Sequence, residues 1–199
     1  MADRAFAELE PAANVVIRNL KYLPEFADAK IAIIGGLTIM KYDVDFLITV
    51  QGAPASQQAE FLVYNSGNGK VIQIDMCPID LPLYLPSAAV PISSISTGNL
   101  PYISELDLLV FKIYSCGMRP TTAKKNCDAS DAERILRDLS LKGPIVLSPV
   151  QKTAVSKGLD DLATYSRKHK TWWLAKLGMN SQARSPRKDM IRSTPKKAI

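Results

Sequence analysis

Three aspartates in this chain have the residue type and spacing for metal chemistry. Asp43 and Asp45 open one apolar run, and Asp75 lies near the end of another. Side chains two apart on a strand point to the same face, so Asp43 and Asp45 would lie side by side, where their charges repel. A cation between them relieves that repulsion, and carboxylate oxygens are the hard ligands that Mg²⁺ prefers. The spacing therefore predicts a magnesium site on a strand, completed by Asp75 from a neighbouring strand.

A pair of metal ions held by such carboxylates is the usual apparatus of phosphoryl-group transfer. One ion activates an attacking hydroxyl, and the other stabilises the leaving pyrophosphate. Asp75 suits the role of general base, because it would contact only the ion on the hydroxyl side. Each feature also has a plainer interpretation. An Asp-x-Asp pair often caps a turn or is solvated, and a glycine pair such as Gly35 and Gly36 usually marks a turn.

Strands in the first half of the chain would have to position these carboxylates. Apolar, β-branched runs predict four strands, at residues 30–34, 43–50, 60–64 and 70–76. The last two would form a hairpin across a Gly-Asn-Gly turn. A further short strand is expected at 88–92, and residues 12–22 have the apolar spacing of a helix that ends before Pro24.

The second half of the chain has helical periodicity instead. N-capping residues and apolar stripes predict four helices, which begin after Ser104, at Asp128 or Ser130, at Ser148 and at Thr171. Lys112 lies at the edge of the first apolar stripe, where its side chain could reach a cleft or the solvent.

The expected fold class is therefore α+β, with a small mixed β-sheet and a helical C-terminal half. A chain of 199 residues predicts one domain with a tail. We expect the domain to span residues 1–179, with the sheet core at 30–76 and the helical part at 104–178.

The positive charge of the chain is concentrated in its last twenty residues. The net charge is +6, and residues 180–199 contain six basic side chains and one acidic side chain among Ser and Pro residues. This composition predicts a disordered basic tail. The tail could be a nuclear-localisation segment, a tether for nucleic acid, or only a solubilising extension. We therefore expect nucleic-acid contacts through the tail only, and a cytoplasmic location, or a nuclear one if the tail directs it.

Several other kinds of protein are not supported by the composition. Cys77, Cys116 and Cys127 are odd in number and lack a Cys-x-x-Cys pair, so neither a disulfide framework nor a zinc site is expected. The single histidine, His169, has basic neighbours and is expected to be solvated. No apolar run reaches the eighteen or so residues of a membrane span, and the first residues lack a signal-peptide pattern, so no membrane partner is expected.

Residues 31–75 resemble the nucleotidyltransferase superfamily, the fold shared by DNA polymerase beta and many small transferases. The order of a strand, a Gly pair, Asp-Val-Asp-Phe-Leu and a later strand with one Asp is similar to the minimal, AbiEii-like toxin type and its fungal relatives. The stretches at 101–113 and 124–133 are similar to the same group. The resemblance implies the sheet of the nucleotidyltransferase type.

The resemblance also implies roles for individual residues. In such relatives the three aspartates bind metal, the glycine pair contacts the triphosphate, and a helical lysine reaches the nucleotide phosphates. Those roles fall on the three aspartates named above, on Gly35 and Gly36, and on Lys112.

The link between Gly36 and Asp43 departs from the pattern of these relatives. Six residues lie between them, fewer than two helical turns, where the relatives place a full helix and a basic loop. Two hypotheses follow. The chain is a Mg²⁺-dependent enzyme that moves a nucleoside monophosphate from an NTP to a hydroxyl of unknown identity, or a catalytically degenerate relative that serves as a binding or interaction module.

Overall fold

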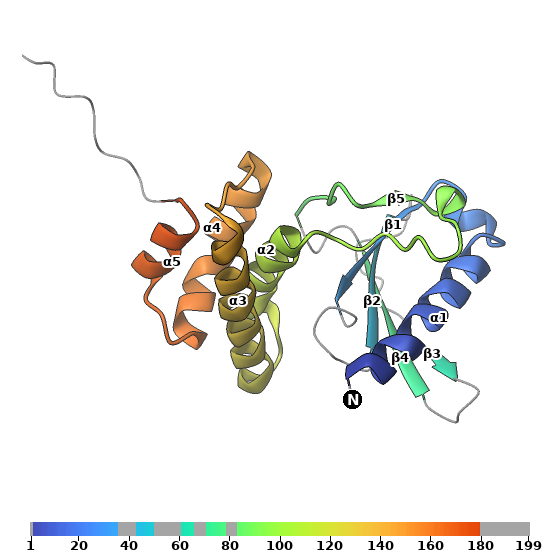
Figure 1. Cartoon of the computed structure of the whole chain (residues 1–199), viewed down its shortest axis with the longest axis horizontal. Helices are drawn as coiled ribbons and strands as arrows, with labels where there is room; N and C mark the ends of the chain where they lie inside the picture. Colours follow the sequence, from blue (N-terminus) through green and yellow to red (C-terminus); the bar gives the residue numbers. More distant parts are fainter. Residues whose placement is uncertain (1, 36–42, 50–60, 66–70, 79–82, 180–199) are drawn as a thin grey trace, which may run out of the picture.

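The predicted division into a sheet and a helical half is confirmed by the computed structural model, which describes residues 2–35, 43–49, 61–65, 71–78 and 83–179. The fold class is α+β, as expected (Figure 1). The elements follow one another in the order α1 (Ala2–Leu20), η1 (Pro24–Phe26), β1 (Lys30–Gly35), β2 (Asp43–Ile48), β3 (Phe61–Asn65), β4 (Val71–Pro78), β5 (Val90–Pro91), η2 (Ile92–Ser94), α2 (Glu105–Ser115), η3 (Cys116–Met118), α3 (Thr122–Lys142), α4 (Pro149–Tyr165) and α5 (Lys170–Lys176).

The five strands form one mixed sheet in the order β3-β4-β2-β1-β5. The central strands β2 and β4 are parallel, and every other neighbouring pair is antiparallel, including the predicted β3–β4 hairpin. Parallel neighbours need a connection that crosses back, and here that connection contains the edge strand β3. Strand β3 lies between β2 and β4 in the chain and pairs with β4 as a hairpin. The two aspartate-bearing strands, β2 and β4, therefore run parallel in an otherwise antiparallel sheet.

The two faces of the sheet pack against different partners. Strand β2 alternates between them, with Val44, Phe46 and Ile48 on one face and Leu47 on the other. The first face packs against α1, and the second packs against the core of helices α2 to α5. Asp43 and Asp45 lie on the same face of β2 as Leu47, and this face is turned toward helices α2 to α5. Figure 1 shows these helices at the other end of the molecule from α1.

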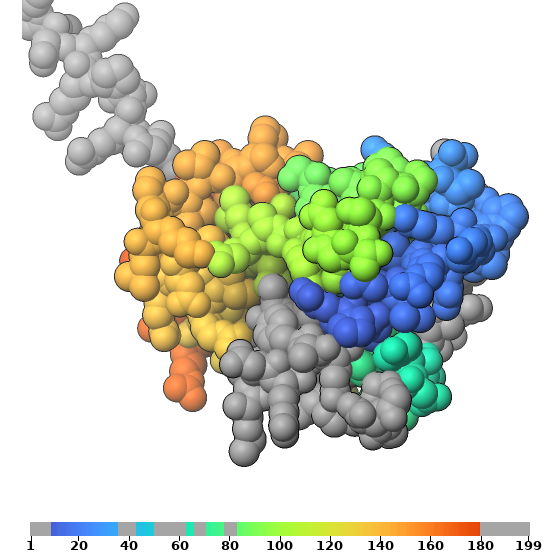
Figure 2. Space-filling view, turned by 45° about the vertical axis from the view of Figure 1, so that its right-hand side comes forward, coloured from blue at the N-terminus to red at the C-terminus, as the bar shows by residue number. Residues whose placement is uncertain are grey.

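A segment between the sheet and α2 holds the helical half in place. Its backbone runs beside β1, where Ile33 N–H donates to Pro101 O at 2.8 Å and Ile103 N–H donates to Ile33 O at 3.1 Å. Helix α2 begins directly afterwards, with Ser104 Oγ accepting from Asp107 N–H at 3.0 Å. Figure 2 shows this segment, in green, lying between the blue N-terminal half and the orange helices. Helix α2 is thereby fixed against the carboxylate-bearing face.

Helices α2 and α4 cross at very short range. A Cβ atom built on Gly158 of α4 would lie 2.4 Å from Ile113 O and 2.6 Å from Tyr114 Cα of α2. Only a residue without a side chain allows this approach. Helix α4 begins as predicted, since Ser148 and Gln151 form a capping box.

Two helices begin earlier than the sequence pattern predicted. Helix α1 begins at Ala2 rather than at residue 12, because its buried stripe continues through Leu9 while Pro11 lies on the exposed side. Helix α3 begins at Thr122, capped by Thr121, rather than at Asp128 or Ser130. Its first turns are mostly exposed and therefore lack an apolar stripe. No helix in the described part of the chain combines the length and apolar character that crossing a bilayer requires.

Candidate metal site

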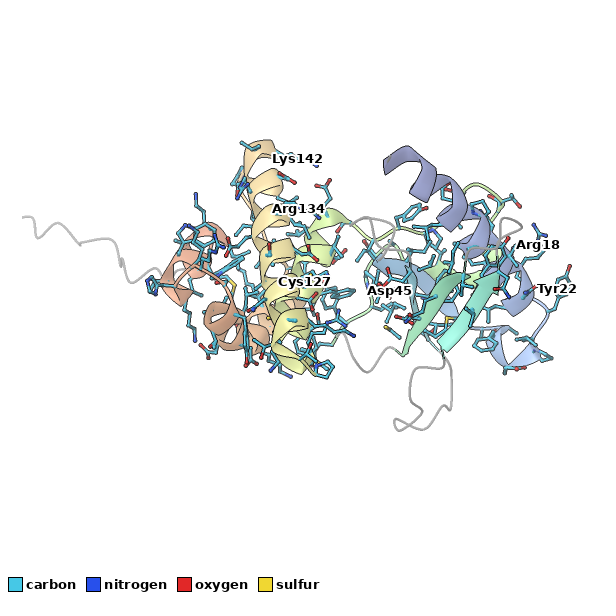
Figure 3. All side chains as sticks on the ribbon, turned by 90° about the horizontal axis from the view of Figure 1, so that it is seen from below. Arg18, Tyr22, Asp45, Cys127, Arg134 and Lys142 are labelled. Carbon is cyan, nitrogen blue, oxygen red and sulfur yellow. The ribbon has the colours of Figure 1, made fainter. Side chains whose placement is uncertain are left out.

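The three predicted metal ligands meet where β2 and β4 run side by side. In the parallel register Asp45 lies beside Asp75, and Asp43 lies beside Gln73. One carboxylate oxygen from each aspartate lies within 4.8 Å of the others. Figure 3 shows Asp45 on the side of the sheet that faces the helices. The pairing of two strands thus converts aspartates that are thirty positions apart in the chain into one cluster.

Gly35 makes room for one of these carboxylates. It lies opposite Asp45 in the antiparallel β1–β2 pair, next to an irregularity after Ile33. A Cβ atom at residue 35 would lie 2.2 Å from Asp45 Oδ2, so any side chain there would displace the carboxylate. The structure therefore places Gly35 at the cluster and gives a steric reason for the glycine, whereas its predicted contact with a triphosphate remains a prediction. Gly36 and the link to residue 42 lie outside the described residues.

The cluster concentrates negative charge in a partly desolvated place. Burial and the neighbouring carboxylates of Asp43 and Asp75 raise the pKa of Asp45 from 3.8 to about 7, although Lys112 opposes the rise. Asp75 is held by Gln73, whose Nε2 donates to Asp75 Oδ1 at 2.7 Å. A divalent cation would offset this repulsion, and a set of three carboxylates fits one in donor type and number.

A cavity of about 310 Å³ opens beside the cluster. Its sheet wall contains Ile34, Gly35, Asp45, Asp75 and Cys77. Its helical wall combines apolar and cationic residues of α2 and the segment that follows it, namely Leu108, Phe111, Lys112, Tyr114, Ser115, Met118, Arg119 and Pro120. The site therefore has a carboxylate wall, a cationic wall and apolar surface between them.

Lys112 lies in the cavity wall rather than in the solvent. Its side chain is buried, and Nζ lies 2.7 Å from Asp128 Oδ1 and 3.3 Å from Asp131 Oδ2 on α3. These two carboxylates, one helical turn apart, hold the ammonium group between α2 and α3. The predicted contact of Lys112 with nucleotide phosphates remains a prediction, and in this structure its charge is already paired.

Arg119 is a cavity residue that the sequence analysis missed. Its Nε lies 2.5 Å from Asp128 Oδ2, so Asp128 binds both cations of the cavity wall. Burial by itself would raise the pKa of Asp128, but Lys112 and Arg119 outweigh it and the pKa is lowered. Arg119 follows a 3₁₀ turn outside any apolar stripe, so periodicity gave no signal. The sequence did contain a related signal. Asp128 and Asp131 lie three positions apart on one face of α3, a pattern that predicts cationic partners from a neighbouring segment.

Cys77 lies on the same wall as the carboxylates, two residues after Asp75. Burial, with Asp45 and Asp75 nearby, raises the pKa of its thiol from 9.0 to about 12. The thiol is therefore protonated at neutral pH and supplies neither a nucleophile nor an anionic ligand.

Comparison with known proteins finds similarity to a solved structure. No family model matches the chain, and no curated protein matches it. Among solved structures it is similar to an antigenic nucleotidyltransferase-like protein from Paracoccidioides brasiliensis, with 15% sequence identity and a TM-score of 0.49. That similarity covers 87% of this chain and 93% of the other.

Proposed function

We propose that this chain is a nucleotidyltransferase of the DNA polymerase beta-like superfamily, of the minimal AbiEii-like type that its sequence resembles. It would transfer a nucleoside monophosphate from an NTP to a hydroxyl group, with Mg²⁺ as the metal. One observation carries the proposal: three carboxylates from two parallel strands meet, and two of them, Asp45 and Asp75, line a cavity of about 310 Å³. This arrangement combines a place for a cation with room for a substrate.

The aspartates are the proposed metal ligands. Asp43 and Asp45 would bind the metal together, and Asp75 would complete the set. The raised pKa of Asp45 supports this assignment, because a buried cluster of like charges favours a cation over solvent. When bound, Mg²⁺ would neutralise phosphate charge and lower the pKa of the attacking hydroxyl.

Asp75 is the proposed acceptor of the proton from the attacking hydroxyl. The hydrogen bond from Gln73 Nε2 to Asp75 Oδ1 fixes one carboxylate oxygen and so orients the group. A substrate hydroxyl placed in the cavity would meet this carboxylate on the sheet wall.

The cationic wall is the proposed binding site for the phosphates. Lys112 and Arg119 have several N–H donors each, so both can keep their bonds to Asp128 while donating to a ligand. The backbone N–H group of Gly35, on the sheet wall, would contribute, together with that of Gly36, as the sequence resemblance implies. The transferred phosphate would then lie between the carboxylate wall and the cationic wall.

Label transfer from α-³²P-labelled NTPs in Mg²⁺ tests this proposal. We expect incorporation into a protein, RNA or small-molecule acceptor mixture by the wild type. Asp43→Asn and Asp45→Asn should each lower it about 100-fold or more, since each removes a charged ligand but little volume. Asp138→Asn, on the exposed side of α3, makes the same chemical change away from the cavity and should leave incorporation unchanged. The proposed transferase activity would be refuted if the wild type and all three variants incorporated label only at background level and neither Mg²⁺ nor NTP changed the Tm.

Binding without transfer is a second candidate function. The observation that favours it is the pairing of both cavity cations with carboxylates on α3. The three aspartates of the metal site and the two on α3 outnumber the two cations, Lys112 and Arg119. The excess of negative charge in this group disfavours binding of a triphosphate without its metal. A Tm that rises with Mg²⁺ and NTP, without any label incorporation, would distinguish this function from catalysis.

A further inference from the structure

The two halves of the chain carry opposite net charge. Residues 1–103 contain ten acidic and six basic side chains, and residues 104–179 contain thirteen basic and eight acidic ones. The sheet half therefore has a net charge of −4 and the helical half +5, a separation that the near-neutral sum conceals. The helical half thus attracts polyanions in its own right, without the tail.

A basic and aromatic surface lies where α3, the end of α4 and the start of α5 meet. We define this α4–α5 surface by Lys125, Tyr165, Arg167, Lys168 and Trp172. Lys125 Nζ lies 4.9 Å from the ring centroid of Tyr165, and Lys168 Nζ lies 5.4 Å from that of Trp172. Both rings are partly exposed, and Arg167 and Lys168 are fully on the surface. Each of the two rings therefore has a lysine ammonium group over one of its faces.

The loop that presents this surface is held by a buried residue. Trp173 is fully buried, and its Nε1–H donates to Ser166 Oγ at 3.0 Å. Ser166 Oγ in turn accepts from Lys168 N–H at 3.1 Å and donates to Lys168 O at 2.9 Å. The ring of Trp172 packs edge-on against that of Trp173, with centroids 5.1 Å apart. The surface is thus formed before any ligand arrives, which lowers the entropy cost of binding.

The acidic neighbours of this surface leave its principal charges available. Glu133 accepts from the backbone N–H of Arg167, and Asp160 pairs with Lys170. Among the residues that the structure describes, the side chains of Arg167 and Lys168 form no ion pair. Among the described residues neither cation is therefore neutralised by a carboxylate, and Lys168 Nζ lies over the Trp172 ring.

We propose that the α4–α5 surface binds single-stranded nucleic acid, beyond the contacts expected of the tail. Phosphates would bind Arg167, Lys168 and Lys125, and the two lysines would then leave the ring faces of Tyr165 and Trp172 to unstacked bases. Partly exposed rings between cations fit a single strand, whose bases are accessible, better than a duplex. The proposal does not depend on the transferase activity.

Fluorescence anisotropy of a fluorescein-labelled 12-nucleotide RNA tests the proposal, with the full chain in EDTA and without NTP. We expect the double variant Arg167→Glu, Lys168→Glu to weaken binding about tenfold or more at low salt, because phosphate contacts are lost and repulsion is added. Trp172→Ala should weaken binding at least about fivefold through lost stacking. Asp45→Asn should bind like the wild type, which separates this result from the fate of the metal site.

Two control variants test whether the effect belongs to this surface. Arg18→Glu, Lys30→Glu makes the same change in net charge on exposed residues of the sheet half, where Figure 3 shows Arg18 at the other end of the molecule, and should change affinity less than twofold. The second control replaces the six basic residues of the tail by Gln. Equal losses in both glutamate double variants would refute a localised site. Loss of all binding in the tail variant, with no effect of Arg167→Glu, Lys168→Glu, would place binding in the tail alone and refute the proposal.

Discussion

Asp45 lies in an unfavourable electrostatic position for a carboxylate. Its pKa rises from 3.8 to about 7 because of burial and the adjacent charges of Asp43 and Asp75. The folded chain therefore holds this proton more tightly than the unfolded chain does. The contribution of Asp45 to the free energy of unfolding therefore falls as the pH rises from about 4 to about 7, and above pH 7 it stays reduced. Without a cation, the ionised Asp45 thus destabilises the fold.

Removing this charge should make the metal-free protein more stable. We expect Asp45→Asn to raise the Tm at pH 8 in EDTA by at least about 2 °C, with a smaller gain at pH 5. Mg²⁺ should raise the Tm of the wild type at pH 8 and leave that of the variant nearly unchanged. Thermal unfolding followed by circular dichroism measures both effects, with Asp138→Asn as the control. A lower Tm for Asp45→Asn at pH 8 in EDTA would contradict the charge-repulsion account.

At the residue scale, what the sequence can predict depends on how local the cause is. Asp43 and Asp45 share a face because of strand geometry, and that expectation needed no tertiary information. The surroundings of Lys112 could not be derived in the same way, since its partners Asp128 and Asp131 belong to a different helix. The sequence pattern therefore left Lys112 open between a cleft and the solvent, and it did not predict the pairing with α3.

At the scale of elements, the crossing of α2 and α4 fixes one wall of the cavity. Gly158 allows the backbone of α4 to approach Ile113 O closely, and Lys112 precedes Ile113 in α2. The position of α2 against α4 therefore depends on a residue that does not line the cavity.

A methyl group at this crossing should separate the helices. We expect Gly158→Ala to destabilise the fold by about 1–3 kcal/mol, because α4 must move away from the backbone of α2. A helix interior otherwise favours alanine over glycine by roughly 0.5–1 kcal/mol, so the sign itself is informative. Urea unfolding measures the change, and Ser156→Ala on the exposed side of α4 is the control, expected to lie within about 0.5 kcal/mol of the wild type. A stabilised Gly158→Ala variant would show that the crossing is looser than described.

Element types were predictable where capping and periodicity agreed. Ser104 and Ser148 cap α2 and α4 as expected, because a cap followed by a buried stripe is a local signal. The start of α3 was placed too late because its first turns face the solvent, where only the cap at Thr121 marks the boundary. The parallel pairing of β2 with β4 depends on the whole sheet and could only be expected as proximity.

At the scale of the whole molecule, the carboxylates and the excess of basic residues lie in different halves. The aspartate cluster belongs to the sheet half and the α4–α5 surface to the helical half. The cavity lies between the sheet half and the helical half, and each half supplies one of its walls. A polyanion would therefore be attracted to the helical side first and repelled from the carboxylates unless a cation were bound there.

The parallel pairing of β2 and β4 has a consequence for the order of folding. Contacts of α2 with α3, such as that of Lys112 with Asp128, are closer in sequence than the pairing of Asp45 with Asp75, and contacts of short separation form faster. We expect the parallel pair to form late, so that Mg²⁺ lowers the unfolding rate and leaves the refolding rate unchanged in stopped-flow measurements, with Asp45→Asn insensitive to the ion. A faster refolding in Mg²⁺ would place the pairing early.

A slip of one residue between these strands would turn the two carboxylates to opposite faces, so a bound cation would select the chains whose strands are in the correct register.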